Sequence, residues 1–311
     1  MAGRKERGSL SGGVTYLNHG SWGPSPRVVQ QARLERLCRL EAEPMDFFLR
    51  RMEDDVERAT HRLAEFVGAD PDGLIFVDNA TVGMNIVAAN VDLEPGDEVL
   101  LSDREYGAVV RSWRERCRAA GARLVVAQLP HPVVDREAFV SAFLEGMSER
   151  TRLIVCSHVT SSTATRLPVE PICRAARERR VPVCIDGPHA VAMVPLNLEA
   201  LGCEFYAASC HKWLSAPFGS GFLYVAKHRR QGLEPAIPSW GGRLSGRPPS
   251  WKDEFSWSGT RDPGACLCVP DAIDFLGEYG VERFRRETHE LARYARERIT
   301  KLTGMAAIVP D

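Results

Sequence analysis

The chain has 311 residues, of which 44% are hydrophobic, and its 40 basic and 41 acidic residues leave a net charge of −1. This length and composition allow a large buried core and suggest about two domains. The balanced charge favours neither nucleic acid nor a membrane surface as a partner, and no apolar run is long enough to cross a bilayer.

Nine cysteines are scattered along the chain, and no pair has the spacing of a zinc site. Their odd number fits free thiols in a reducing compartment, so we expect a cytoplasmic protein without a bound metal. Residues 1–15 are rich in Gly, Ser and basic residues and contain no apolar signal core. They are therefore predicted to be a disordered lead-in.

The segment after this lead-in is predicted to be a polar loop, residues 16–24, followed by helices over 26–42 and 54–67. From there, short apolar strands alternate with amphipathic helices. Strands are predicted over residues 74–77, 99–101, 124–127, 153–156, 181–185, 205–209 and 222–225, and helices over 81–89, 108–120, 135–149 and 171–179. This alternation predicts an α/β fold with a mostly parallel sheet covered by helices on both faces.

The C-terminal part has a different pattern. Residues 243–257 contain Gly, Pro and Ser and are predicted to be a loop or linker, helices are expected over 265–279 and 281–302, and a strand is expected to start at 306–309. We therefore expect an N-terminal loop and helix over 16–50, a large domain over 51–245, and the start of a small domain over 258–311. A strand with nothing after it leads us to expect that this small domain is truncated.

Lys212 follows the apolar strand 205–209 and precedes a glycine-rich turn, Phe218–Gly221. A lysine among apolar neighbours loses hydration, which favours its neutral amine and makes it available to attack a carbonyl carbon. Most lysines after a buried strand are surface residues, so this feature by itself is a weak signal.

Other strand ends also carry polar groups, at the edge where parallel sheets bind their ligands. Asn79, Ala80 and Thr81 begin a helix, whose backbone N–H groups can bind a phosphate; the alternative is that Asn79 or Thr81 only caps the helix. Tyr106 follows the next strand and can stack on a planar ligand, unless it is an ordinary, partly buried tyrosine.

Two further strand ends complete the set. Residues 157–163, which include Ser161, carry hydroxyl groups and a histidine that can bind a phenolate or carboxylate, unless they form a capped turn. Asp186 begins the stretch that ends at His189, and its carboxylate is costly to bury without a cation, unless it serves as a helix cap. A phosphate seat, a stacking ring, an acid for a ring nitrogen and a lysine for an aldehyde together indicate pyridoxal phosphate (PLP).

These motifs resemble the class V aminotransferase family of fold type I PLP-dependent enzymes. The resemblance rests on residues 79–81, 186–189, 209–213 and 259–263, and residues 17–21 and 259–263 are similar to its isopenicillin N epimerase branch, which is related to the cysteine desulfurases. It covers about residues 16–280. It implies a three-layer α/β/α fold, PLP as cofactor and a homodimer with shared active sites.

The resemblance also implies individual roles. Lys212 would bond to the PLP aldehyde, Asp186 would pair with the ring nitrogen, and Tyr106 would stack on the ring. The full set of implied cofactor-binding residues is Lys212, Asp186, His189, Ala80, Thr81, Tyr106, Ser161, Ser209, His211 and Thr260, with His189 and Ser161 near the phenolic oxygen and Thr260 reaching the phosphate from the neighbouring subunit.

The substrate side is less defined, because the family's usual arginine for the substrate carboxylate has no assignable position. Weak candidates for substrate binding are Asn18, His19, Arg243 and Arg261. Removal and return of the α-proton on opposite faces needs a second proton donor besides Lys212, for which Tyr106 and His19 are candidates.

We therefore expect an enzyme that acts at the α-carbon of an amino acid, epimerase-like or lyase-like, with transamination less favoured. A cysteine desulfurase or C–S lyase is an alternative, although none of the nine cysteines stands in the loop that desulfurases use. An incomplete PLP-fold binding protein is the alternative of another class. A Rossmann dehydrogenase is excluded, since no Gly-x-Gly-x-x-Gly follows an early strand.

Overall fold

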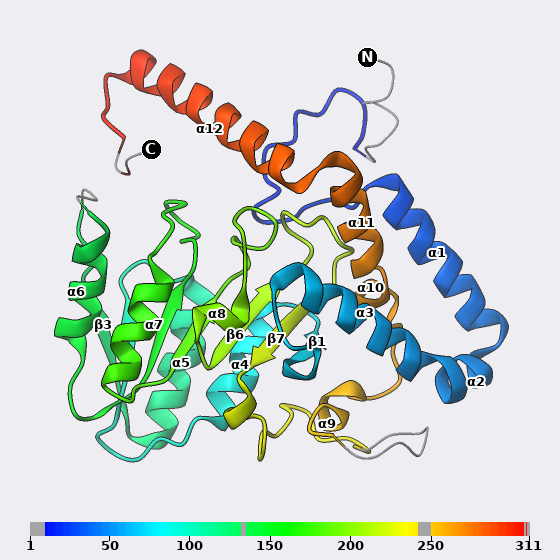
Figure 1. Ribbon diagram of the computed structural model, residues 1–311, viewed down its shortest axis with the longest axis horizontal. Helices are drawn as coiled ribbons and strands as arrows, with labels where there is room; N and C mark the ends of the chain where they lie inside the picture. Colours follow the sequence, from blue (N-terminus) through cyan, green and yellow to red (C-terminus); the bar gives the residue numbers. More distant parts are fainter. Residues whose placement is uncertain (1–9, 132–134, 242–249, 308, 310–311) are drawn as a thin grey trace.

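One seven-stranded sheet lies between two layers of helices in the computed structural model, which describes residues 10–131, 135–241, 250–307 and 309 (Figure 1). The strand order is β1-β7-β6-β5-β4-β2-β3, and every neighbouring pair is parallel except the two that β7 makes with β1 and β6. The predicted α/β fold with a mostly parallel sheet is confirmed.

The strands are β1 (Leu74–Val77), β2 (Glu98–Ser102), β3 (Arg123–Ala127), β4 (Thr151–Ser157), β5 (Val183–Asp186), β6 (Phe205–Ser209) and β7 (Gly221–Val225). The helices between them are α4 (Ala80–Asn90), α5 (Gly107–Ala120), α6 (Arg136–Gly146), α7 (Val169–Glu178) and α8 (Leu198–Leu201). Each predicted strand and helix of this region is confirmed with small shifts at its ends. Helix α8 was not predicted, because four residues are too few to show a helical period.

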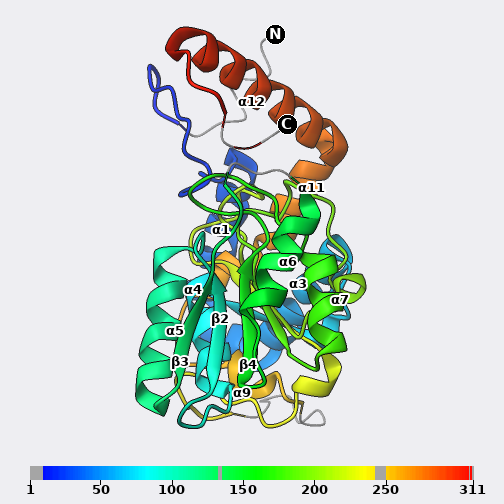
Figure 2. The ribbon, with the colours of Figure 1, turned by 90° about the vertical axis from the view of Figure 1, so that its left-hand side faces the viewer.

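The strands are apolar on both faces because each face is covered. Successive residues of a strand point to opposite faces, so Leu100 and Ile154 lie in the core beneath α6 and α7, whereas Leu101 and Val155 pack against α4 and α5. Figure 2 shows α4 and α5 on one side of the sheet and α3, α6 and α7 on the other. Because helices cover both faces, the ends of the strands are the part of the sheet that the helices leave uncovered.

Because β7 runs back beside β6, residues 210–220 form a turn beyond the carboxyl end of β6. Gly221, the first residue of β7, requires the absence of a side chain: a Cβ there would lie 2.6 Å from the carbonyl oxygen of Ala208 and 2.8 Å from the Cα of Asn79. The start of α4 can therefore lie directly against this turn, which carries Lys212.

The N-terminal helices are α1 (Arg27–Ala42), α2 (Pro44–Asp46), the π-helical turn η2 (Phe47–Arg51) and α3 (Met52–Val67). Helix α3 ends at Gly68, which adopts the left-handed conformation with φ of 63°. Both predicted helices are confirmed, and α2 and η2 lie in what was predicted to be a connection.

The C-terminal helices are α9 (Asp253–Ser256), α10 (Gly264–Leu267), α11 (Val269–Tyr279) and α12 (Val281–Thr303). Three predictions are corrected here. Residues 250–257 contain α9 and are not simply a loop, and the predicted helix 265–279 is divided at Cys268. The predicted strand at 306–309 is wrong for residues 306, 307 and 309, because a strand needs a neighbour with which to pair, and residue 308 lies outside the described part.

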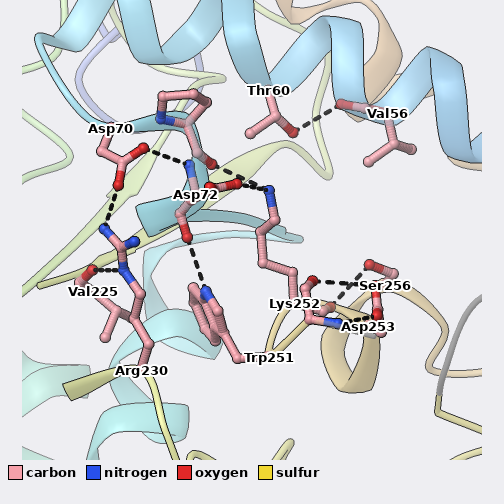
Figure 3. A network of polar contacts seen from close by, with 12 residues as sticks. Val56, Thr60, Asp70, Asp72, Val225, Arg230, Trp251, Lys252, Asp253 and Ser256 are labelled. Carbon is pink, nitrogen blue, oxygen red and sulfur yellow. Dashed lines mark hydrogen bonds and ion pairs between the residues drawn. The ribbon is translucent and has the colours of Figure 1, made fainter. Parts of the chain in front are cut away.

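The segment that carries α9 is fixed to the start of the sheet by polar contacts (Figure 3). Trp251 donates its ring N–H to the carbonyl oxygen of Asp72 at 2.8 Å, and Lys252 Nζ lies 3.2 Å from Asp72 Oδ1. Asp72 belongs to the short 3-10 helix η3 (Pro71–Gly73), which leads into β1. Residues 250–256 are therefore held under the edge of the sheet at β1.

Helix α12 extends beyond the body of the fold, and none of its residues is buried (Figure 1). Arg285 near its start donates to the carbonyl oxygens of Ala192 and Val194, which follow β5. Among the described helices, none combines the length and apolar character needed to cross a membrane. The division at residues 50, 245 and 258 stays a prediction, and residues 1–9 of the predicted lead-in lie outside the described residues.

Candidate functional site

The carboxyl ends of β4, β5 and β6 lie side by side and each presents a polar side chain. Ser157 is the Cα partner of Asp186 in the β4–β5 ladder, and Asp186 is the partner of Ala207, two residues before Ser209. By the alternation of the strands, Asp186 and Ser157 face the side covered by α4 and α5. The predicted polar groups of these three strands therefore lie together at the carboxyl end of the sheet.

Lys212 lies in the turn after β6 and contacts a histidine from the turn after β5. Its Nζ is 3.0 Å from Nε2 of His189. Burial lowers the pKa of Lys212 below its usual value, although the charge of Asp186 opposes this effect. Burial, together with the charge of Lys212, lowers the pKa of His189 to about 4. His189 is thus neutral near pH 7, and the tautomer of its ring decides which of the two nitrogens donates this hydrogen bond.

Asp186 is buried, with 6% of its surface exposed. Its side chain forms no hydrogen bond or ion pair among the described residues, although its backbone oxygen accepts from the N–H of His158. Burial and the charge of Glu105 raise the pKa of Asp186 to about 7, and Lys212 acts in the opposite direction. A buried carboxylate without a partner is a costly feature that a cationic ligand would relieve.

The start of α4 adjoins the same turn. Asn79 accepts a hydrogen bond from the N–H of Val82 at 3.0 Å, so its interpretation as a helix cap is confirmed. The N–H of Ala80 donates to Ser209 Oγ at 3.0 Å, and Thr81 is exposed in the first turn. Ala80, Thr81 and Ser209 therefore lie together at the positive end of an 11-residue helix, which suits an anion.

The N-terminal loop lies over the turn that carries Lys212. The N–H of Gly23 donates to the carbonyl oxygen of His211 at 2.9 Å. A Cβ on Gly20 would lie 3.2 Å from the ring of Trp213 and 3.5 Å from the ring of His189. His19, the neighbour of Gly20, is partly buried, and this burial lowers its pKa. The loop therefore forms one wall of the site.

Comparison with known proteins agrees with this geometry. The family description Aminotransferase class-V matches residues 23–311. The chain belongs to the class-V aminotransferase family. Isopenicillin N epimerase of Amycolatopsis lactamdurans is 40% identical over 99% of this chain and 81% of its own length. L-cysteine desulfhydrase of Arabidopsis thaliana is 28% identical over 90% of this chain and 64% of its own length.

A solved structure of C-DES, with glycine covalently linked to its PLP cofactor, has the same fold as this class-V chain. The TM-score is 0.78 at 23% identity, and the match covers 88% of this chain and 74% of C-DES. The three-layer α/β/α architecture predicted from the resemblance is therefore confirmed. At this identity the likeness concerns the fold alone.

Thr260 and Arg261 line a cavity of about 670 Å³. Asp78 and Phe218 line the same cavity, so it borders the start of α4 and the end of the lysine turn. Arg261 forms an ion pair with Asp78, with 2.6 Å between Nη1 and Oδ1. Since Asp78 engages its guanidinium, Arg261 is less suited to a substrate carboxylate than predicted.

Three other candidates are less closely tied to the site. Tyr106 is 50% exposed and directly precedes α5. Ser161 is exposed in the loop after β4 and forms no hydrogen bond with the other candidates among the described residues. Asn18 contributes its carbonyl oxygen to a turn, where it accepts from the N–H groups of Ser21 and Trp22. Arg243 lies outside the described residues.

Glu105 is a residue to which the sequence pattern gave no role. Its two carboxylate oxygens accept hydrogen bonds from Ser102 Oγ at 2.5 Å and from Ser157 Oγ at 2.6 Å. Both serines are buried, so the carboxylate lies inside the protein although part of the residue is exposed. The only signal in the sequence was an acidic residue beside Tyr106, which is typical of a surface loop.

The residues present fit PLP. Asp186 is a buried carboxylate that lacks a partner, and the buried Nδ1 of His211 likewise has none among the described residues. Gly221 leaves room for the backbone of the α4 start, where a phosphate can bind. Lys212 supplies an amine whose protonation burial disfavours. These groups match a ring nitrogen, a phosphate and an aldehyde in one ligand.

Proposed function

We propose that this chain is a PLP-dependent enzyme that acts at the α-carbon of an amino acid, as an epimerase. The observation that carries the proposal is the contact of Lys212 with His189 beside Asp186, whose carboxylate has no partner among the described residues. A pyridine aldehyde needs such an amine and such an acid. The 40% identity to an isopenicillin N epimerase supports the choice of reaction.

Lys212 has two tasks in this proposal. Because burial lowers its pKa, a larger share of the amine is free to bond to the carbonyl carbon. With a substrate bound, the same Nζ would take the proton from the α-carbon. His189 holds Nζ in place through their 3.0 Å hydrogen bond. PLP, when bound, supplies the aldehyde and a ring that withdraws negative charge from the α-carbon.

Asp186 has the task of keeping a proton on the ring nitrogen, which is where the electron-withdrawing power of the ring originates. Ala80, Thr81, Ser209 and His211 would bind the phosphate, and Ser161 would lie near the phenolic oxygen.

Epimerisation also needs a proton donor on the face opposite Lys212. Tyr106 at the start of α5 and His19 in the N-terminal loop are the candidates for this role. His19 adjoins Gly20, which lies against the ring of His189.

We also propose a homodimer in which Thr260 of one subunit reaches the phosphate held by the other. The cavity that Thr260 lines has an apolar wall that includes Phe48, Met52 and Trp257, and a second copy would cover it. The nine free cysteines, eight of them buried, support a reducing cytoplasmic location.

A C–S lyase that acts on cysteine is the second candidate, favoured by the similarity to an L-cysteine desulfhydrase at 28% identity. Such a reaction uses the same Lys212 and Asp186 and needs only a leaving group on the β-carbon, so no second proton donor is required. A binding protein without catalysis is disfavoured by the contact of Lys212 with His189.

The test is the visible absorbance of the purified protein with added PLP. We expect a band that Lys212→Ala abolishes and that Lys227→Ala, a matched change at another lysine, leaves unchanged. A wild-type protein that takes up no PLP contradicts the proposal. In deuterated water, α-hydrogen exchange with inversion and without sulfide or pyruvate supports the epimerase, whereas sulfide and pyruvate support the lyase.

A further inference from the structure

Glu105 and Asp186 place two carboxylates at one end of the sheet. Glu105 Oε2 lies 2.6 Å from Ser157 Oγ, and Ser157 is the direct partner of Asp186 in the β4–β5 ladder. Paired residues of neighbouring parallel strands lie about 5 Å apart and point to the same face. The two carboxylates are therefore separated by one serine side chain.

Two hydroxyl donors hold the carboxyl group of Glu105. One of its oxygens accepts from Ser102 Oγ and the other from Ser157 Oγ, so each carboxylate oxygen has a donor. Ser102 ends β2 and Ser157 ends β4, so the carboxylate joins two strand ends and orients the chain just before Tyr106. A charge held this firmly keeps a fixed position relative to the sheet.

Glu105 lies among other acidic groups. The titratable groups that face it are Asp103, Asp186 and the thiols of Cys156 and Cys184. Desolvation raises the pKa of Glu105 more than its hydrogen bonds lower it. Glu105 forms no ion pair among the described residues. Glu105 and Asp186 are thus two buried carboxyl groups that form no ion pair among the described residues, and a cationic ligand beside them would favour their ionised forms.

We propose that Glu105 is a second negative charge of the cofactor pocket, a positioning residue that acts with Asp186 to select the ring-protonated form of the pyridine aldehyde. Its task differs from that of Asp186, because it acts through space on the same ring nitrogen and makes no contact of its own there. The inference rests on the proposed function, since it requires that PLP binds at Asp186.

Glu105→Gln is the direct test, because it removes the charge and keeps the size and one acceptor oxygen. The probes are PLP and its carbocyclic analogue, in which a C–H replaces the ring nitrogen and no ring proton can be held. Dissociation constants are measured by equilibrium dialysis of the full chain. We expect Glu105→Gln to weaken PLP binding about tenfold, as one pKa unit of ring protonation requires, and to leave binding of the analogue nearly unchanged.

Two further variants serve as controls. Glu98→Gln makes the same change at the other end of β2, where the glutamate is paired with Arg123, and should leave both constants unchanged. Glu105→Asp retains the charge and should retain the preference for PLP over the analogue.

Equal losses for PLP and the analogue in Glu105→Gln would mean that Glu105 only supports the fold, and this result overturns the inference, as does the absence of any loss. If the wild-type protein binds neither probe, the proposed function fails as well. A wild type that binds PLP, with a Glu105→Gln variant that loses no preference for it, separates failure of this inference from failure of the function.

Discussion

Buried acidic residues form ion pairs at the amino end of the sheet, whereas those at the carboxyl end form none among the described residues. At the amino end of β2, Glu98 accepts from Arg123 and from Ser148 Oγ, each at 2.5 Å, and the adjacent Asp97 accepts from Arg152 Nε at 2.9 Å. At the carboxyl end, Asp186 and Glu105 have no ion-pair partner among the described residues.

This difference separates stability from function along the strands. The amino end neutralises its own charges, because arginines from neighbouring strands are part of the fold. The acids of the carboxyl end have no such partners among the described residues, so ionising them costs stability until a cationic ligand is bound. A charge that only a ligand can neutralise is what distinguishes a binding site from a structural ion pair.

Asp186→Asn tests this contrast with the largest expected effect. The variant retains the shape of the side chain but can no longer keep a proton on a ring nitrogen through its charge, so we expect α-hydrogen exchange to slow by about 10³-fold. The same change should raise the free energy of unfolding of the cofactor-free protein at pH 8, by on the order of 1–3 kcal/mol, since a buried charge is removed. Exchange is measured by proton NMR in deuterated water, and stability by urea unfolding.

Asp97→Asn is the matched control for the amino end, because Asp97 is the acid that Arg152 and the N–H of Glu94 bind. It should lower the stability of the cofactor-free protein and leave exchange unchanged. If both variants destabilise the cofactor-free protein alike, the two ends of the sheet do not differ as stated.

Much of this contrast could be predicted from sequence. The short apolar strands predicted the sheet, and the rule that ligands bind at carboxyl ends selected Asp186, Lys212 and the α4 start as candidates. Their positions follow from the local pattern of each strand and from the mostly parallel arrangement that the alternation of strands and helices predicts.

Contacts between distant segments could not be predicted. The hydrogen bonds of Glu105 join residues 102, 105 and 157, and Arg261 lies 183 residues from its partner Asp78. No periodic pattern in the sequence predicts either contact. The strand expected at 306–309 failed for a related reason, since an apolar run forms a strand only beside another one. Sequence reasoning thus found residues that follow strands and missed those defined by their tertiary partners.

The pH dependence of stability gives a second test. The folded pKa of Asp186, about 7, lies above its usual value of 3.8, so the folded protein binds an extra proton between these limits. Stability of the cofactor-free protein should therefore fall as pH rises from about 4 to about 7, by up to about 1.4 kcal/mol per pH unit from this group. The measurement is urea unfolding at several pH values, with Asp186→Asn as reference.

The reference variant is needed because histidines oppose this trend. Burial lowers the pKa of both His158 and His189 to about 4, so the unfolded chain binds more protons than the folded one between pH 4 and 6.5, and these groups raise stability with pH. Both proteins share that contribution, and it cancels in the difference. If the difference in free energy of unfolding between wild type and Asp186→Asn does not change with pH, the pKa of Asp186 is not raised in the folded protein.

Glu98→Gln sharpens the comparison at the amino end. Loss of the charge weakens the bonds from Arg123 and Ser148, so we expect the free energy of unfolding to fall by about 1–2 kcal/mol. Glu105→Gln should leave it unchanged or raise it, because Glu105 has no cation to lose. Urea unfolding of both cofactor-free variants checks this. A similar loss of free energy of unfolding in the two would mean that the hydrogen bonds from serine, and not the ion pair with Arg123, account for the contribution of each glutamate to stability.

Gly20→Ala has the smallest expected effect. It tests the wall that the N-terminal loop forms at the carboxyl end of the sheet. The added methyl group would lie 3.2 Å from the ring of Trp213 and 3.5 Å from that of His189, so these rings must move by a few tenths of an ångström. Since His189 holds Lys212, we expect α-hydrogen exchange to slow by about two- to fivefold, with a stability change below about 1 kcal/mol. Gly277→Ala in α11 adds the same group into open space and should leave exchange unchanged. An unchanged rate of α-hydrogen exchange in Gly20→Ala would mean that the N-terminal loop moves to accommodate the methyl group. The position of Lys212 would then depend on β6 and β7 alone.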